Sequence, residues 1–246
     1  MEDRLSRMRL MVGEKKLKQL QKAHVLVAGC GAVGGFAIEA LARSGIGHLT
    51  IVDNDVVSIT NINRQLVALH STLGQKKVDV MKKRVLDIAP DMKVDMVDCL
   101  INADSVDKIL ACRPDFVVDA IDSLNPKVCL IEAMVKAEIP FVSSMGAAMK
   151  TRPELVRVAK MKDSYQCPLA AFIRKRLRRR NIPLDFPVVY SPEKPDKAHL
   201  KIPEETTQKS GRVRNEMGSL PTLTGIFGLT CAQVALDYFI KNQSFF

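Results

Sequence analysis

Short apolar runs alternate with longer segments of helical spacing over the first 150 residues. The runs at residues 24–29, 48–53, 94–97, 116–119 and 140–144 predict buried strands. Segments 36–43, 78–88, 105–110 and 125–137 repeat apolar residues every three or four positions and predict helices. Strands that alternate with helices indicate right-handed crossovers and a mainly parallel sheet. Because the strand runs are continuously apolar, helices should cover both faces of an α/β, Rossmann-like sheet.

The pattern changes after residue 150. Residues 155–159 predict an added edge strand and residues 168–180 a basic helix. Residues 183–218 are rich in Pro, Lys and Glu and predict a mobile loop, and residues 221–240 return to an apolar helix. We therefore expect a Rossmann-like core at 1–150. A basic, partly antiparallel extension at 151–246 should pack as part of the same domain.

The positive charge is concentrated in one part of the chain. The 246 residues carry a net charge of +10, and 47% of them are apolar, enough for a substantial core. Residues 150–215 hold 17 Lys and Arg against 7 Asp and Glu, while the rest of the chain is balanced. An enzyme for small metabolites does not need this distribution, whereas a polyanionic partner would explain it.

The termini and cysteines indicate the compartment. The first twenty residues lack a signal-peptide pattern, and no run of about eighteen apolar residues is apparent. We expect a soluble, cytoplasmic protein without stable membrane insertion. The six cysteines form no C-x-x-C pair, which excludes the usual spaced-cysteine zinc site and predicts free thiols.

A glycine-rich turn follows the first predicted strand. Gly29, Gly31 and Gly34 form G-x-G-x-x-G ahead of a helix, where backbone amides and the helix dipole can hold a phosphate. Asp53 ends the second strand, where its carboxylate can accept both ribose hydroxyls. The alternative is a structural turn without a ligand. The two features together predict a nucleotide but not which one.

Three later positions favour ATP over a dinucleotide. Arg64 can clamp outer phosphates, Lys77 adds an ammonium at a helix start, and Asp122 follows the fourth strand as a candidate Mg²⁺ ligand. Alone, each could be a solvated charge or a turn residue. Their order around one predicted sheet edge favours ATP·Mg²⁺. No His–acid pair suited to hydride transfer is evident, which weakens the NAD-linked alternative.

The combined motifs resemble the MoeB/ThiF/HesA family, relatives of ubiquitin-activating enzymes. They are G-x-G-x-x-G, D-x-D-x-V-x-x-x-N-x-N-R-Q, G-x-x-K and D-A-I-D-S. The resemblance implies an adenylating enzyme in which Asp122 binds Mg²⁺ and an N-terminal arginine crosses a homodimer, best matched by Arg4, with Arg7 or Arg9 open. The implied catalytic residues are Arg64, Lys77, Asp122, Asn61 and Arg4. The implied ATP-binding residues are Gly29, Gly31, Gly34, Asp53, Asp55, Asn61, Arg64, Gln65, Lys77 and Asp122.

Later segments resemble the tRNA threonylcarbamoyladenosine dehydratase subfamily. They are residues 167–180, residues 188–195, and Gly218 to Pro221, and the zinc cysteines of sulfur-carrier enzymes are absent. This resemblance implies ATP-dependent adenylation of the threonyl carboxylate in tRNA, then ring closure. Activation of a ubiquitin-like sulfur carrier stays open, as does an NAD-linked or nucleotide-sensing module. A sulfur-relay or other accessory protein is a possible partner.

The basic helix is the predicted tRNA contact. The candidate residues are Arg174, Lys175, Arg176, Arg178, Arg179 and Arg180. A solvated face or a contact with anionic lipid would give the same run. Phe172, Phe186 and Tyr190 are candidates for stacking on bases. Cys167 could suggest a thioester, although an unreactive thiol is the simpler interpretation.

Overall fold

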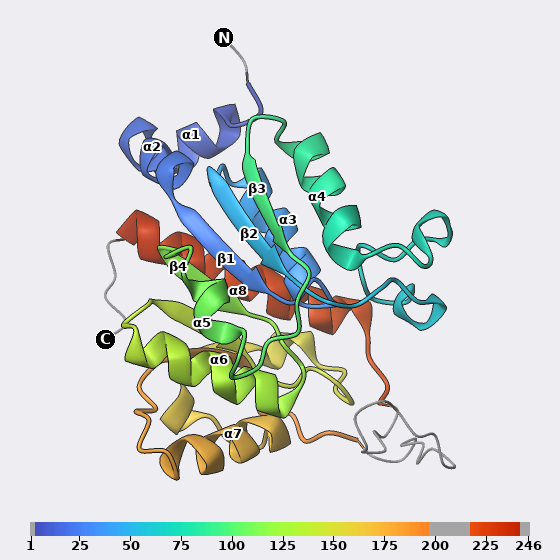
Figure 1. Cartoon of the computed structure of the whole chain (residues 1–246), viewed down its shortest axis with the longest axis vertical. Coiled ribbons are helices and arrows are strands. Elements are labelled where there is room, and N and C mark those ends of the chain that lie inside the picture. Colours follow the sequence, from blue (N-terminus) through green and yellow to red (C-terminus); the bar gives the residue numbers. More distant parts are fainter. Residues whose placement is uncertain (1–2, 197–216, 242–246) are drawn as a thin grey trace.

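The computed structural model describes residues 3–196 and 217–241, which form one seven-stranded sheet with helices on both faces (Figure 1). The strand order is β3-β2-β1-β4-β5-β7-β6, and every pairing is parallel except that of β6 with β7. The strands are β1 (His24–Ala28), β2 (His48–Val52), β3 (Lys93–Val97), β4 (Phe116–Asp119), β5 (Phe141–Ser144), β6 (Arg157–Lys160) and β7 (Pro187–Tyr190). The predicted Rossmann-like fold is confirmed.

The helices divide between the two faces. Helices α3, α4 and α8 contribute to the apolar cluster on one face, and α5, α6 and α7 to the cluster on the other. The helices are α1 (Ser6–Val12), α2 (Glu14–Lys22), α3 (Gly34–Arg43), α4 (Lys77–Ile88), α5 (Val106–Leu110), α6 (Leu124–Lys136), α7 (Pro168–Arg178) and α8 (Pro221–Lys241). Four 3₁₀ turns join them: η1 (Ile59–Asn61), η2 (His70–Thr72), η3 (Pro153–Leu155) and η4 (Met161–Asp163).

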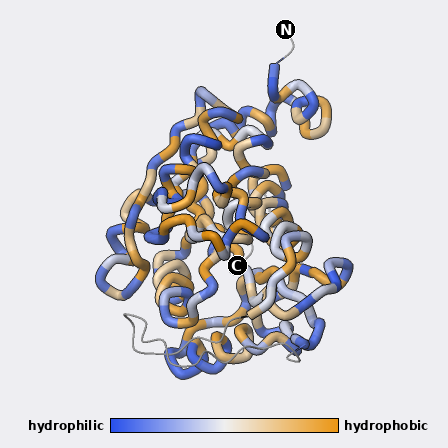
Figure 2. Tube along the Cα trace, turned by 90° about the vertical axis from the view of Figure 1, so that its right-hand side faces the viewer, coloured by the Kyte–Doolittle hydropathy of each residue, from blue (hydrophilic) through white to orange (hydrophobic). Residues whose placement is uncertain are grey.

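The two-sided covering explains the continuous apolar strands. In β1, Val25 and Val27 face one cluster and Leu26 and Ala28 face the other, because successive strand residues point to opposite faces. Figure 2 shows most of the apolar trace inside the molecule and hydrophilic segments along its edge. Edge strand β3 differs, with a burial pattern that alternates only partly and leaves Asp95 exposed.

Helix α8 runs along the α3 face of the sheet and contacts α3, β4 and β5. Its length and apolar composition would also suit a membrane-spanning helix, contrary to our expectation that no such stretch exists. However, 56% of that stretch is buried within the protein, as in the core helix of a globular domain. Gly228 permits the contact, since a Cβ there would lie 2.2 Å from the Val33 carbonyl oxygen.

Replacing Gly228 by alanine should therefore destabilise the fold by about 1–3 kcal/mol, because the backbone at Val33 cannot yield as a side chain can. Gly225→Ala on the same helix is the matched control, since its nearest contact would be the Phe36 ring at 3.4 Å. Urea denaturation of both variants measures the difference. Equal stability of the two would contradict this account of the α3–α8 contact.

The predicted loop at 183–218 is wrong over four residues. Residues 187–190 form the buried strand β7, which lies between β5 and β6. The sequence did not predict this strand because prolines lie on both sides of it. Pro187 occupies the first strand position, where the missing N–H does not interrupt the hydrogen bonds of the residues that follow. The predicted edge strand at 155–159 is displaced to Arg157–Lys160, after the η3 turn. Residues 197–216 of the predicted loop lie outside the described residues.

Candidate functional site

The carboxyl ends of β1, β2 and β4 meet at one edge of the sheet. The Gly29 amide donates to the Val52 carbonyl at 2.7 Å, and the Ala120 amide donates to the Ala28 carbonyl at 2.9 Å. These bonds join the three segments that follow the strands: the glycine turn, the segment from Asp53 to Lys77, and the segment from Asp119 to Ser123. Open parallel α/β sheets bind ligands at this edge.

The three glycines of the turn have different roles. Gly29 has φ +100°, and a Cβ there would lie 3.0 Å from the Ala120 carbonyl oxygen. At Gly34 a Cβ would lie 1.7 Å from the Gly29 carbonyl oxygen. The fold therefore requires glycine at both positions. At Gly31, by contrast, the nearest atom would be Gln65 Nε2 at 3.8 Å. Protein packing thus leaves Gly31 open at the start of α3, where a phosphate could approach the backbone.

Asp53 is fixed by two backbone amides. Its carboxylate accepts from the Cys30 amide at 2.7 Å and from the Asp55 amide at 2.8 Å. Burial raises the pKa of Asp53, although Lys77 and the two amides oppose this shift. Each Asp53 carboxylate oxygen thus accepts one hydrogen bond from the protein. Each can accept at least one more, which would suit two ribose hydroxyls.

Lys77 begins α4 and is tied to Asp55. Its ammonium Nζ lies 2.8 Å from Asp55 Oδ2, and its amide donates to the Asp55 carbonyl at 3.0 Å. The lysine side chain is 6% exposed, whereas that of Asp55 is 63% exposed. Lys77 is therefore fixed by its buried surroundings, whereas the largely exposed Asp55 carboxylate can turn towards solvent.

Residues Asn61, Arg64 and Gln65 lie on and after η1. The Asn61 side chain accepts from the Ser58 amide at 3.2 Å and caps the turn. Arg64 is half-buried and donates to the Thr60 carbonyl at 2.9 Å and to Asn63 Oδ1 at 2.8 Å. The buried Gln65 Oε1 has no hydrogen-bond partner among the described residues. The other atom of the same amide, Gln65 Nε2, would lie 3.8 Å from a Cβ at Gly31, so a nucleotide bound at the open turn could satisfy the unpaired oxygen.

Asp122 is the predicted metal ligand. It is exposed, and its Oδ1 accepts from the Ser123 hydroxyl at 3.1 Å. No group of three His, Cys, Asp or Glu side chains suited to a metal ion occurs in the part of the chain that the structure describes. A single carboxylate nevertheless suits Mg²⁺, which takes its other ligands from phosphates and water.

A buried ion pair beside this edge was missed from the sequence. Lys127 Nζ lies 2.8 Å from Asp119 Oδ2, both side chains are fully buried, and Ser143 donates to the same oxygen at 2.6 Å. The pair joins α6 to β4 just before the segment that carries Asp122. The sequence did contain one indication of this pair. Lys127 lies four residues before the apolar Ile131, on the same face of α6, and a lysine on a buried helix face needs a charged partner.

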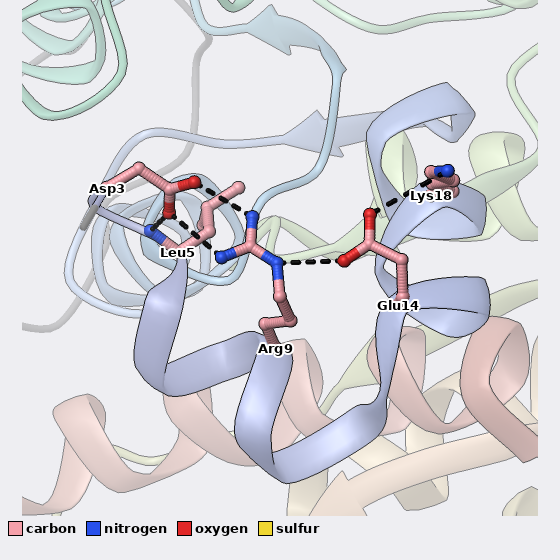
Figure 3. Close-up of polar contacts among 5 residues, drawn as sticks. All are labelled: Asp3, Leu5, Arg9, Glu14 and Lys18. Carbon is pink, nitrogen blue, oxygen red and sulfur yellow. Dashed lines mark hydrogen bonds and ion pairs between the residues drawn. The ribbon is translucent and has the colours of Figure 1, made fainter. Parts of the chain in front are cut away.

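Arg7 and Arg9 lie on α1, and Arg4 lies just before it. Figure 1 shows α1 and α2 at the end of the sheet opposite the glycine turn. Arg4 pairs with Asp91 at 3.0 Å and donates to a backbone carbonyl. Arg9 pairs with Asp3 and Glu14, each at 2.8 Å (Figure 3). Arg7 is exposed and makes no hydrogen bond or ion pair with a described residue. None of them approaches the glycine turn of its own chain.

The basic residues at 174–180, on α7 and directly after its end at Arg178, fall into two groups. Three donate to acceptors on neighbouring elements: Arg174 to Ser164, Arg176 to Asn125, and Arg180 to Glu132. Three are exposed without a hydrogen bond or ion pair to any described residue: Lys175, Arg178 and Arg179. Of the stacking candidates, Phe186 and Tyr190 are wrong, since both are buried in the sheet layer, whereas Phe172 is 59% exposed.

Two further expectations require comment. A His–acid pair does exist, with His48 Nε2 2.7 Å from Asp95 Oδ2. The pair joins β2 and β3 towards their amino ends, away from the glycine turn. It therefore does not support a hydride-transfer reaction at the candidate site. All six cysteines are free thiols, as predicted, and Cys167 is 2% exposed, which leaves little room for a thioester.

Comparison with known proteins gives consistent matches. The sequence model of the ThiF family matches residues 3–245. The Bacillus subtilis tRNA threonylcarbamoyladenosine dehydratase is 39% identical over 85% of this chain and 82% of that protein, and the Haemophilus influenzae protein of the same name is 34% identical over 93% and 90%. The Escherichia coli tRNA N6-threonylcarbamoyladenosine dehydratase TcdA, solved in complex with ATP, superposes with a TM-score of 0.87 at 32% identity, covering 97% of this chain and 94% of TcdA.

Proposed function

Because the chain belongs to the ThiF family, we propose that it is an ATP-dependent tRNA threonylcarbamoyladenosine dehydratase. The Bacillus subtilis and Haemophilus influenzae relatives with this name each match more than four fifths of its length. The observation that carries the proposal is the gathering of Asp53, Lys77 and Asp122 around a glycine turn that packing leaves open at Gly31. This set suits a nucleoside triphosphate, and the positive extension suits RNA.

Each residue at the edge takes a role that its surroundings support. Asp53 accepts the ribose hydroxyls, and the turn at Gly29, Gly31 and Gly34 receives the phosphates. Gln65 lies beside Gly31 and contributes a polar contact, and Asn61, whose carbonyl accepts from the Gln65 amide, contributes another. Asp55 releases Lys77 towards the phosphates when ATP arrives, because its own side chain is largely solvated. Arg64 then exchanges its Thr60 carbonyl bond for phosphate oxygens.

The reaction proceeds in two steps. A carboxylate oxygen of the threonyl group attacks the α-phosphorus of ATP, and the bond to pyrophosphate breaks. A nitrogen or oxygen of the same modified nucleoside then attacks the activated carbonyl carbon, and AMP leaves with the former carboxylate oxygen. The nucleophile loses its proton to solvent, so the nucleoside loses one water overall. Lys77 and Arg64 stabilise the negative charge that develops on the phosphates. No protein nucleophile is needed.

Mg²⁺ is the metal that this site fits. Asp122 would hold it together with ATP phosphates and water, and the ion would supply Lewis-acid stabilisation of the phosphate charge. The solvent exposure of Asp122 leaves its carboxylate free for such a role. A tRNA substrate also fits a cytoplasmic protein.

The adenylation site would be completed in a homodimer. The N-terminal arginines lie at the end of the sheet opposite the glycine turn, so only a partner copy could bring one to the phosphates. Arg4, the predicted residue, would first leave Asp91, whereas Arg7 has no described contact to break. Arg9 would lose two carboxylate partners and is the least suited.

Subunit mixing tests this arrangement. Arg4→Ala, or Arg7→Ala, should inactivate the enzyme, as should Lys77→Ala. Mixing the arginine variant with the lysine variant should restore about a quarter of wild-type turnover, because half of the dimers are mixed and each mixed dimer has one intact site. The arginine whose variant complements Lys77→Ala is the one that crosses the interface. Arg9→Ala is mixed with Lys77→Ala in the same way, and no recovery with any of the three arginine variants would contradict a shared site.

Nucleoside mass analysis tests the function itself. Purified protein, ATP and Mg²⁺ are incubated with tRNA that carries threonylcarbamoyladenosine, and the modified nucleoside should lose the mass of one water. An unchanged mass with an ATP-binding protein would overturn the dehydratase. Pyrophosphate exchange that depends on a small protein ending in Gly-Gly would favour sulfur-carrier activation. Selective calorimetric binding of NAD over ATP would favour the nucleotide-sensing alternative.

A further inference from the structure

The outward face of α7 carries an aromatic side chain that the fold does not use. Ala170, Ile173 and Leu177 are fully buried and mark the side of α7 that packs on the protein. At about 100° per residue, Phe172 lies roughly opposite their centre, together with residues three and seven positions later. Phe172 is 59% exposed, so it contributes little to the core.

Lys175 and Arg179 occupy those two positions, on the same stripe as Phe172. Arg179 follows the last residue of α7 but keeps helical backbone angles, so the spacing extends to it. Lys175 and Arg179 are both exposed and make no hydrogen bond or ion pair with any described residue. The three arginines that bond to Ser164, Asn125 and Glu132 lie nearer the buried side and hold this segment against α6 and against the residue that follows η4. The basic run thus contains a structural set and a free set, which its sequence alone did not separate.

We propose that Phe172, Lys175 and Arg179 form a binding surface for unpaired RNA nucleotides. Phe172 stacks on one base, and the two cations contact the phosphates on either side of it. Stacking on an aromatic ring requires an unstacked base, which loops offer and duplexes do not. This inference rests on the proposed function and identifies the part of the tRNA that α7 recognises, namely the single-stranded loop around the modified nucleoside.

The position of α7 supports this assignment. Arg176 donates to Asn125 Oδ1 at 2.6 Å, and Asn125 is three residues after Asp122. At its other end, α7 begins beside the segment that follows β5, where a Cβ at Gly146 would lie 3.5 Å from Leu169. The helix therefore starts at the same sheet edge as the candidate adenylation site. Nucleotides that flank a base bound there would pass over α7.

RNA is favoured over an anionic membrane by the composition of the surface. A helix that lies in a membrane interface needs a broad apolar face, with several large residues. On the outward side of α7, Phe172 is the only large exposed hydrophobic side chain among the described residues of that helix. One aromatic ring between cations instead suits a base between phosphates.

The test compares two matched pairs of variants. Phe172→Ala removes the ring, and Leu229→Ala removes an exposed apolar side chain on α8 as its control. The double variant Lys175→Ala, Arg179→Ala removes two charges, and Lys15→Ala, Lys16→Ala removes two exposed charges on α2 as its control. Fluorescence anisotropy measures binding to an RNA stem-loop and to an uninterrupted RNA duplex over a range of salt concentrations, without ATP. Vesicles of phosphatidylserine and phosphatidylcholine serve as the lipid probe.

We expect Phe172→Ala to weaken stem-loop binding about tenfold and to leave duplex binding unchanged, since one stacked base is lost. The charge variant should weaken both and lower the salt slope by about 1.4, because two phosphate contacts are lost. The two controls should bind like wild type. Equal losses on loop and duplex would overturn stacking. Binding of vesicles that depends on Phe172, without RNA binding, would overturn the RNA assignment.

The same measurements separate this inference from the proposed function. If the wild type dehydrates the modified tRNA but Phe172→Ala keeps full stem-loop affinity, the surface is wrong and the function stands. If the wild type leaves the nucleoside mass unchanged but Phe172→Ala loses stem-loop affinity selectively, the function is wrong and the RNA surface stands.

Discussion

Replacing Asp122 by alanine is expected to lower the rate of tRNA dehydration by about a thousandfold or more, with the fold intact. A metal ion at a phosphate stabilises the transition state by several kcal/mol, and each 1.36 kcal/mol is about tenfold in rate. The side chain is exposed and its described hydrogen bond is to the adjacent Ser123, so its loss should cost little stability. The measurement is single-turnover formation of the dehydrated nucleoside at several Mg²⁺ concentrations, beside thermal unfolding.

Asp104→Ala is the matched control for this variant. Asp104 is an exposed aspartate in the turn before α5, so the substitution removes the same charge elsewhere. The control should keep wild-type turnover and the same Mg²⁺ dependence. Near-normal turnover of Asp122→Ala would remove Asp122 from the metal site. Loss of its unfolding transition would instead assign Asp122 a structural role.

Replacing Lys127 by methionine should destabilise the protein by about 3–5 kcal/mol, because Asp119 would keep a buried charge without its counterion. At about 2–4 °C per kcal/mol for a chain of this size, the unfolding midpoint should fall by roughly 10 °C. The Ser143 hydroxyl and the Ile121 amide also donate to the Asp119 carboxylate, but neutral donors offer less than an ammonium and cannot replace it. Urea denaturation at neutral pH measures the change.

Two comparisons make this result specific to the buried pair. Lys136→Met on the same helix breaks an exposed pair with Glu132 and should cost less than about 1 kcal/mol. The double variant Asp119→Leu, Lys127→Met removes both charges and should recover most of the lost stability. If Lys127→Met were no more harmful than Lys136→Met, the buried pair would contribute nothing to the β4–α6 junction.

Local pattern predicted most of the fold because its elements are long or strongly apolar. The strands at β1, β2, β4 and β5 and the helices α3, α4, α6 and α8 each bury a continuous or periodic apolar face, and such faces are visible in sequence. Strand β7 was missed because prolines flank it on both sides, whereas β4 and β5, which are equally short, lie on either side of the predicted helix at 125–137. Its hydrogen bonds come from β5 and β6, which are distant in sequence, so pairing rather than propensity makes it a strand.

Sequence alone determined the residue types of the candidate site and their order along the chain. The glycine turn, Asp53, Lys77 and Asp122 could be identified because each follows a recognisable strand or begins a helix, and parallel strands bring such positions to one edge. The same reasoning favoured ATP over a dinucleotide and placed the positive charge in residues 150–215. Local spacing was sufficient for these conclusions.

Tertiary structure decided which of these groups are already bound to the protein. Only the folded chain shows that Gly31 is open while Gly29 and Gly34 are enclosed, and that Lys127 neutralises Asp119 inside the core. It likewise divides the basic helix α7 into arginines with protein acceptors and a free stripe around Phe172. The physical reason is that a charge or ring acquires its role from neighbours that are far away in sequence, and these neighbours are set by packing.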